Sequence, residues 1–489
     1  VNLVSKTPTK DRELSFMANG TTAKGLDLSG FYSERYGKVG LTVFGSRNTA
    51  SPYDPADIGL TAIPKFKRYT LNPRLFVYGD KTTMDVGFSY ITEDRVGGSM
   101  DYIKKGTSGY FEENNTDRFT TQFGISHRLG ERSGINFKNS YTRFDRAITI
   151  PSYQFQGLQQ STFSEFTYSN EGEKAQWVVG ANVLTDGFAE EGQPANLKRN
   201  YHYNTYGVFI QNSWSPTSKF TLESGLRGDY VSQYGFELLP RVSALFRVTP
   251  KLTTRIGGGS GYKVPTVFTE ESERIQFVRV LPINQEGTRN ERSLGGNWDI
   301  NYRTSIGAVG FSINQLFFYT RLNKPLILTQ SGNDFLFQNA NGHIDTRGIE
   351  TNLKLTYGDF KLFIGYTYAD VENHFGGNKT WMPLNAKHRL NNVLFYEKDE
   401  KWKLGLEAYY ISGQQLNDGA SGKPYWITGF MIERLWEKVS VFINFENFTD
   451  TRQTRFDTIY TGPINNPVFR DIYAPVEGFV TNGGFKIRL

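Results

Sequence analysis

Apolar and polar side chains alternate along many segments of this 489-residue chain. The alternation is clear in MDVGFSY at residues 84–90, in WVVGANV at residues 177–183 and in VSVFINF at residues 439–445. Because successive side chains of a strand point to opposite faces, each segment predicts a strand with one apolar face and one small or polar face. Such strands suit a sheet that has lipid on one side and water or a polar filling on the other.

Turn residues divide the alternating segments into a regular series, and the series predicts twenty-two strands. At about 3.3 Å per residue and a tilt of about 45°, ten residues cover roughly 23 Å, close to the apolar band of a membrane barrel. Strands of soluble sandwiches are shorter, typically about five or six residues. The strands are expected at residues 12–19, 22–36, 38–47, 67–78, 81–92, 116–129, 132–146, 159–170, 174–186, 200–215, 219–232, 236–248, 251–262, 291–304, 308–322, 343–357, 359–370, 384–398, 401–412, 424–436, 438–449 and 476–489.

The connections between these strands alternate in length. Every second one is brief, such as Gly37 alone or Gly79–Asp80, whereas most of the others are long. This sorting is typical of bacterial outer-membrane barrels, which have short periplasmic turns and long extracellular loops. The fold class predicted is therefore all-β, a 22-stranded antiparallel transmembrane β-barrel. The notable long loops are residues 48–66, 93–115, 263–290, 323–342, 371–383 and 450–475.

Composition excludes several other classes of protein. No apolar run approaches the roughly 18 residues that a membrane-spanning helix needs. The absence of cysteine excludes disulfides and cysteine-ligated metals, and a formal charge of +6 spread over this length gives no basis for nucleic-acid binding. The aromatic content of 15% is sufficient for two interfacial girdles. The chain opens on Val1 without a visible signal peptide, so we expect that processing or truncation removed the true start.

Residues 239–266, LPRVSALFRVTPKLTTRIGGGSGYKVPT, carry a resemblance to a known family. They are similar to the mid-barrel hairpin of TonB-dependent outer-membrane receptors, where a Pro-Arg strand, a short turn and a Gly-rich strand precede an aromatic-x-x-Pro-Thr run. Further along, Arg347–Glu350 resembles the family's basic-Gly-aliphatic-Glu strand. Residues 383–391, PLNAKHRLN, resemble its Pro-x-x-x-Lys-His-Arg strand entry, and residues 444–450 resemble its Asn-rich penultimate strand end.

The resemblance implies a domain organisation and a function. Residues 1–10 look like the last strand of an N-terminal plug, and residues 11–489 would form the barrel. A barrel of this size is plugged, so we expect a plug and its TonB-coupling box to precede Val1. The implied function is energised uptake of a scarce nutrient, a ferric siderophore, another iron complex or cobalamin, across the bacterial outer membrane. Implied partners are outer-membrane lipid, the TonB complex and small-molecule cargo, with a surface lipoprotein as a further candidate. The alternative is a passive channel or adhesin barrel without energy coupling.

Candidate cargo contacts are the aromatic and cationic side chains of the long loops. Each could instead belong to an interfacial girdle or stabilise its loop. No resident cofactor and no metal site is expected, because carboxylates such as Asp54 and Asp57 or Glu112 and Glu113 match no calcium-loop spacing. The candidates are Tyr53, Tyr102, Phe111, Tyr262, Phe277, Arg279, Tyr460 and Tyr473.

The sequence gives little support for haem as the cargo or for an enzymatic function. Haem receptors of the family often carry Phe-Arg-Ala-Pro before a loop histidine, whereas this chain has Tyr-Lys-Val-Pro at residues 262–265 and no histidine in 263–290. His202, His343 and His374 lie near predicted loops, where solvated histidines are common. No enzyme is predicted: the glycine run at 257–261 lacks the Gly-Lys-Ser/Thr of a phosphate loop, and nothing brings a Ser-His-Asp set together.

Overall fold

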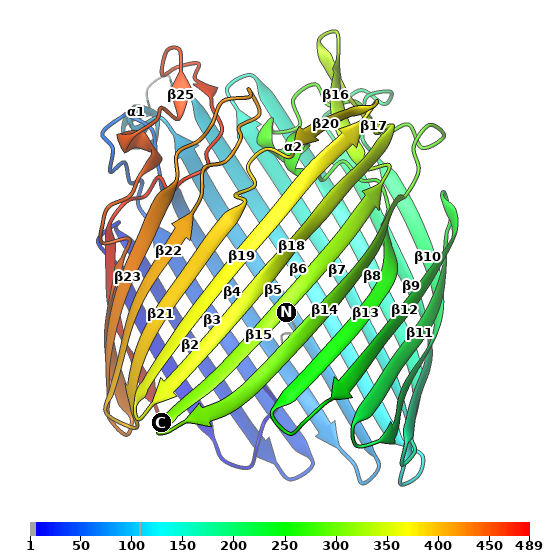
Figure 1. The fold of residues 1–489 in the computed structure, drawn as a ribbon. Coiled ribbons are helices and arrows are strands. Elements are labelled where there is room, and N and C mark those ends of the chain that lie inside the picture. The colour runs from blue at the N-terminus through cyan, green and yellow to red at the C-terminus, as the bar shows by residue number, and fades with distance from the viewer. Residues whose placement is uncertain (1–5, 107–108) are drawn as a thin grey trace.

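The computed structural model in Figure 1 describes residues 6–106 and 109–489. Over these residues the main sheet has 23 strands, and all of them except the four-residue β20 (Asn378–Trp381) form a closed ring. Each ring strand pairs antiparallel with the ring strands that precede and follow it in the chain. The ring closes where β1 (Glu13–Thr21) pairs with β27 (Val480–Arg488). The predicted 22-stranded antiparallel barrel is confirmed.

Most ring strands lie within a few residues of the segments predicted from the alternation. After β1 they are β2 (Gly25–Tyr36), β3 (Val39–Ala50), β4 (Lys65–Tyr78), β5 (Thr82–Gly98), β6 (Phe111–Arg128), β7 (Ser133–Ile150), β8 (Tyr153–Glu171), β9 (Ala175–Glu191), β10 (Tyr201–Thr217), β11 (Phe220–Val231), β12 (Gly235–Arg247), β13 (Leu252–Lys263), β14 (Glu291–Ile306), β15 (Val309–Asn323), β18 (Gly342–Tyr357), β19 (Phe360–Phe375), β21 (His388–Lys398), β22 (Trp402–Ile411), β23 (Tyr425–Leu435), β24 (Val439–Glu446) and β27.

The largest differences lie at the strand ends remote from the tight turns. β5 continues to Gly98 instead of ending near residue 92, and β8 begins at Tyr153 instead of residue 159. The β7–β8 ladder runs out to the pair Ile150 and Tyr153, so only two residues connect these strands. Beyond an apolar band both faces of a sheet are wet, so the apolar alternation fades there although backbone pairing continues.

The outward face of the barrel carries a band of exposed apolar side chains. Val86 on β5, Val208 on β10 and Ile256 on β13 are each more than half exposed. Aromatic rings border this band: Tyr206, Tyr230 and Phe236 stand side by side across β10, β11 and β12. This arrangement follows the predicted pattern of a lipid-facing surface with interfacial aromatic residues. No helix within the described residues has the length and apolarity to cross a membrane.

Tight turns lie at one rim of the barrel and the long loops at the other (Figure 1). The loops contain short elements of their own, which fold over the mouth of the barrel. These are α1 (Met100–Lys105), α2 (Glu270–Arg274), the hairpin of β16 (Leu326–Ser331) and β17 (Asp334–Asn339), β20, the 3₁₀ helix η1 (Gln453–Arg455), and the paired β25 (Tyr460–Thr461) and β26 (Val468–Phe469).

The glycine run at 257–261 lies inside β13, as the sequence predicts. A Cβ at Gly258 would stand 2.9 Å from the carbonyl oxygen of Gly295 on β14, and one at Gly259 would stand 3.0 Å from that of Pro240 on β12. The small residues therefore allow close approach of the neighbouring backbones.

The proposed plug remnant, residues 1–10, is described only from residue 6. Pro8 is buried against Gly40 on β3, and the amide of Arg35 on β2 donates to the carbonyl of Thr9 at 2.7 Å. This short segment lies against the barrel wall, and its assignment to a plug domain stays a prediction.

Candidate functional site

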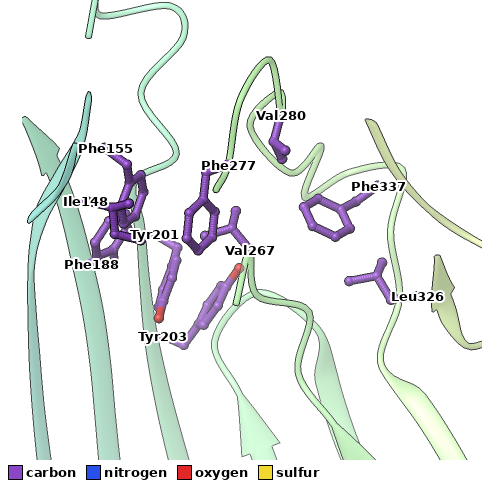
Figure 2. Packing of buried hydrophobic residues seen from close by; sticks show 10 residues of the cluster. All are labelled: Ile148, Phe155, Phe188, Tyr201, Tyr203, Val267, Phe277, Val280, Leu326 and Phe337. Atoms are coloured by element: carbon purple, nitrogen blue, oxygen red, sulfur yellow. The ribbon is translucent and has the colours of Figure 1, made fainter. Parts of the chain in front are cut away.

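The loop rim is held together by its own aromatic core, which Figure 2 shows. The core joins the outer ends of β7 to β10 to the loop 263–290 and the β16–β17 hairpin. At its centre, Phe277 has no exposed surface and stacks on Phe155 with ring centroids 4.1 Å apart. The cluster consists of Ile148, Phe155, Phe188, Tyr201, Tyr203, Val267, Phe277, Val280, Leu326 and Phe337.

A buried ion pair anchors the loop 263–290 to this core. The Arg199 side chain is 2% exposed and that of Glu190 is 0% exposed, and the guanidinium spans both carboxylate oxygens. Arg199 also donates to the Phe277 carbonyl at 2.6 Å and to the Tyr153 hydroxyl at 2.7 Å. Burial alone would lower the pKa of Arg199, but the hydrogen bonds to Glu190 and Tyr153 raise it above its usual value. The loop therefore has a fixed position over the barrel mouth.

Two neighbouring cavities open at the mouth beside this loop. Their volumes are about 740 Å³ and about 640 Å³, within the range of small-molecule sites. Both are lined by Glu270, Arg274 and Leu384, so α2 forms part of the boundary between them. The larger cavity is also lined by Tyr262, Leu322, Pro325, Ile344, Asn373 and Phe375. The smaller is also lined by Asp54, Arg95, Tyr110, Glu112, Arg470 and Asp471.

α2 is placed by bonds to several distant segments. Its N-terminus carries a capping box, in which the Thr269 and Ser272 side chains each accept a hydrogen bond from the other residue's backbone amide. Glu273 forms a 2.9 Å ion pair with Arg146 on β7, and Arg274 forms a 3.3 Å ion pair with Asp471. Arg274 thus stands where loops from opposite halves of the chain meet.

The cavity lining mixes both signs of charge. Arg95, Arg274 and Arg470 line the smaller cavity together with more carboxylates than cations. Burial, reinforced by Glu112, raises the pKa of Tyr110 to about 12, so this phenol remains a neutral hydrogen-bonding group at physiological pH. The lining therefore offers hydrogen bonds and local charges of either sign to a polar ligand.

The structure separates the sequence-predicted contacts. Tyr262 lines the larger cavity and donates to Asp229 at 2.9 Å. Phe277 and Tyr473 are buried, and a buried ring offers no surface to cargo, so we assign both to loop packing. Tyr102 stacks on Phe111 with centroids 4.3 Å apart, which joins α1 to β6.

The three remaining candidates lie in loops outside the lining of the two cavities. Tyr53 forms an isolated bridge with Ile63, Tyr460 donates to the Ile58 carbonyl at 3.3 Å, and Arg279 is exposed. Sequence reasoning missed Glu270, Arg274 and Tyr110, because no periodicity shows which way a loop side chain points. Of their neighbours, only the Thr269–Ser272 capping pair carries a recognisable local signal.

The other polar candidates hold loop structure. Asp54 accepts from the amides of Ile58 and Gly59, Glu112 accepts from Gln276, and Glu113 accepts from the Tyr102 hydroxyl. These bonds give Asp54, Glu112 and Glu113 a role in holding the loops.

Comparison with known proteins adds to this picture. The family model described as "TonB dependent receptor-like, beta-barrel" matches residues 41–448. No curated protein sequence matches the chain. Among solved structures, the siderophore receptor PirA from Acinetobacter baumannii is 12% identical with a TM-score of 0.75, covering 99% of this chain and 81% of its own. The FrpB iron transporter from Neisseria meningitidis is 12% identical with a TM-score of 0.77, covering 98% and 82%. The copper transporter OprC is 11% identical with a TM-score of 0.79, covering 99% and 81%. At these identities the structures show a shared fold.

Proposed function

Because the chain belongs to the TonB-dependent receptor-like β-barrel family, we propose that it takes up a scarce nutrient across the bacterial outer membrane, with TonB supplying the coupling to energy. The cargo class we favour is an iron chelate, with cobalamin as the other compound of suitable size. Solved structures of the same fold are named for siderophore, iron and copper transport, which supports a transport role for this barrel.

The observation that carries the proposal is the pair of cavities at the mouth. They lie at the loop rim, between the outside and the lumen, and are lined by segments as distant in sequence as Asp54 and Val476. Their volumes suit capture of a compact ligand. A ligand captured there must still pass a lumen that is plugged in transporters of this strand number. Movement of a plug against tight binding requires work, which is the physical reason for coupling uptake to TonB.

The test is nutrient-limited growth of a deletion strain. Ferric siderophores of different chemistry, haem and cobalamin are supplied one at a time, and the complete gene is returned on a plasmid. We expect growth on one cargo class to depend on both this gene and TonB. Growth or uptake that needs the gene but persists without TonB would instead support the passive-channel alternative.

Variants at the mouth separate capture from barrel assembly. Arg274→Ala removes a cation shared by both cavities and the ion pair to Asp471. We expect cargo affinity to fall by roughly 5- to 30-fold, corresponding to about 1–2 kcal/mol, with unchanged surface abundance. Arg289→Ala is the matched control, because Arg289 is exposed, bonds locally to Glu286 and Thr288, and lies outside both cavity linings. Equal affinities of the two variants would exclude the mouth cavities as the capture site.

A further inference from the structure

A compact group of histidines and carboxylates lies on the outer wall of the barrel, on the face opposite the larger mouth cavity. The group spans β18 and β19, where His343 stands directly opposite His374 and Asp345 stands opposite Glu372. The larger cavity is lined by Ile344 and Asn373, the residues that alternate with these in sequence. Because strand side chains alternate between faces, the four polar residues face outward.

The height of the group follows from the register. On the outward face, Phe317 on β15 stands beside Ile349 on β18, and Tyr319 stands beside Arg347. Asp345 lies one outward position beyond Arg347, and its Oδ1 accepts from the Tyr319 hydroxyl at 2.9 Å. The group therefore begins one outward-facing position beyond the level of Tyr319, toward the loop rim.

The geometry resembles that of a metal-binding site. Single ligand atoms of His343, Asp345 and His374 all lie within 4.8 Å of one another. Asp345 Oδ2 is 3.4 Å from His343 Nε2 and 3.8 Å from His374 Nε2, and Glu372 Oε2 is 3.5 Å from the same His374 nitrogen. The two imidazole rings lie nearly parallel with centroids 4.7 Å apart. Movements of about 1 Å would bring these atoms to the roughly 2.0–2.2 Å at which Zn²⁺ holds nitrogen and oxygen ligands.

His374 provides a second, independent indication. Its Nε2 is buried within the described structure and has no hydrogen-bond partner there, although two carboxylates face it. Buried polar atoms without a partner are rare in folded proteins because leaving them unpaired is costly. An ion between the nitrogens and carboxylates would satisfy this atom together with His343.

We propose that His343, His374 and Asp345, with Glu372 in reach, bind a divalent transition-metal ion such as Zn²⁺ on the outer wall. Two imidazoles and a carboxylate form a borderline-soft donor set, which selects zinc, copper or nickel over calcium and magnesium. The ion joins two adjacent strands close to the β19–β20 hairpin and thus clips the outer end of this part of the wall. It is a structural site, separate from the cargo path, and it does not depend on which cargo the barrel takes.

Neighbouring cations set the charge of the site. Arg321 donates to both oxygens of Asp345, and Lys379 pairs with Glu372 at 2.7 Å. A carboxylate oxygen has two lone pairs, so Asp345 Oδ2 retains one after accepting from Arg321. The cations hold the carboxylates in place as outer-sphere partners, which is the role that orienting groups take around bound metals.

The test is zinc binding by the complete receptor, purified in detergent with its affinity tag removed and metals stripped by a chelator. Calorimetry is expected to give one Zn²⁺ per chain for the natural protein. Loss of an outer-sphere partner typically weakens metal binding by about 10- to 100-fold. We expect His343→Gln and His374→Gln, which each remove a ligand, to weaken zinc binding by at least this much. The double variant should bind no zinc at this position. His202→Gln is the control, because His202 is at the outer end of β10 and outside this cluster.

Copper provides a spectroscopic test of the ligands. With Cu²⁺ in place of zinc, we expect an electron paramagnetic resonance spectrum with splitting from two nitrogens, reduced to one in each single variant. Heat-dependent migration on a denaturing gel confirms that every variant forms the barrel. Natural protein that binds no more zinc than the folded double variant, or a spectrum without nitrogen splitting, would overturn the proposal.

Discussion

Replacing Arg199 with alanine should release the loop 263–290 from the barrel mouth. The change removes the guanidinium from the buried carboxylate of Glu190 and from the carbonyl of Phe277. It also removes a cation that stands 5.0 Å from the ring of Phe155 in the loop core. Of the hydrogen bonds between residues 190 and 199, only the one from the backbone amide of residue 199 to the Glu190 carboxylate would remain.

The structure sets the size of the effect. Both side chains are almost completely buried, so solvent cannot replace the lost partner. Breaking a buried pair by removing one member typically costs about 3–5 kcal/mol, because an uncompensated charge is left inside. If the cost falls on local opening of the loop, the open population rises between about a hundredfold and a few thousandfold. The ring strands should be unaffected, because their ladders do not depend on this pair.

Hydrogen exchange followed by mass spectrometry measures this opening. The amides of Phe277 and Val278, which bond to Ser272 and Ile275, report on the loop, and the amides of β11 report on the barrel. We expect faster exchange in the loop alone. The control is Arg289→Ala, an exposed change whose effect should stay within about 0.5 kcal/mol.

Two results would contradict this role of the ion pair. Loop exchange in Arg199→Ala within twofold of the natural protein would show that the ion pair does not hold the loop. Equal acceleration in the loop and in β11 would show that the pair stabilises the whole barrel. Adding Glu190→Gln to Arg199→Ala removes the stranded charge, so the double variant should exchange more slowly than Arg199→Ala alone.

Two further predictions concern the barrel wall. Val86→Arg puts a charge on the apolar outward face and should cost about 2–4 kcal/mol of folding free energy near the bilayer midplane. Ser89→Arg, on the opposite face of the same strand, should cost far less. Equal refolding midpoints of the two variants in urea would contradict the assignment of faces. Gly348→Val should abolish refolding, because a Cβ there would collide with the carbonyl of Tyr368 on β19. Gly45→Ala should refold normally, because its Cβ would stand 3.8 Å from the nearest neighbouring atom, the carbonyl oxygen of Thr70. Normal heat-dependent gel migration of Gly348→Val would disprove the steric argument.

The sequence predicted the strands of the barrel wall more completely than the side chains of the loops. Alternation located all twenty-two ring strands, because an apolar outward face and a small or polar inward face impose period two on a strand. Strand ends such as that of β8 at Tyr153 were misplaced by several residues, because both faces are wet beyond the apolar band. Among the candidate cargo contacts, Tyr262 was located at the end of a predicted strand, and it alone of the eight lines a mouth cavity.

The loop side chains could not be placed in the same way. Phe277 and Arg274 are separated by two residues, yet one is buried in the loop core and the other lines both cavities. Loop backbone has no fixed period, so neither position reveals its direction in the sequence. His343 and His374 likewise become neighbours only through the β18–β19 register.

Local patterns in the sequence are enough to predict the fold class, the strand number, the apolar face of each strand and the rim that carries the long loops. These properties depend on local periodicity and turn chemistry, which each segment carries independently of the others. The folded structure was needed to show which loop residues are buried, which line the mouth and which histidines meet on the outer wall. Those outcomes depend on contacts between residues far apart in the chain, and they exist only once the ring has closed and set every strand's register against its neighbours.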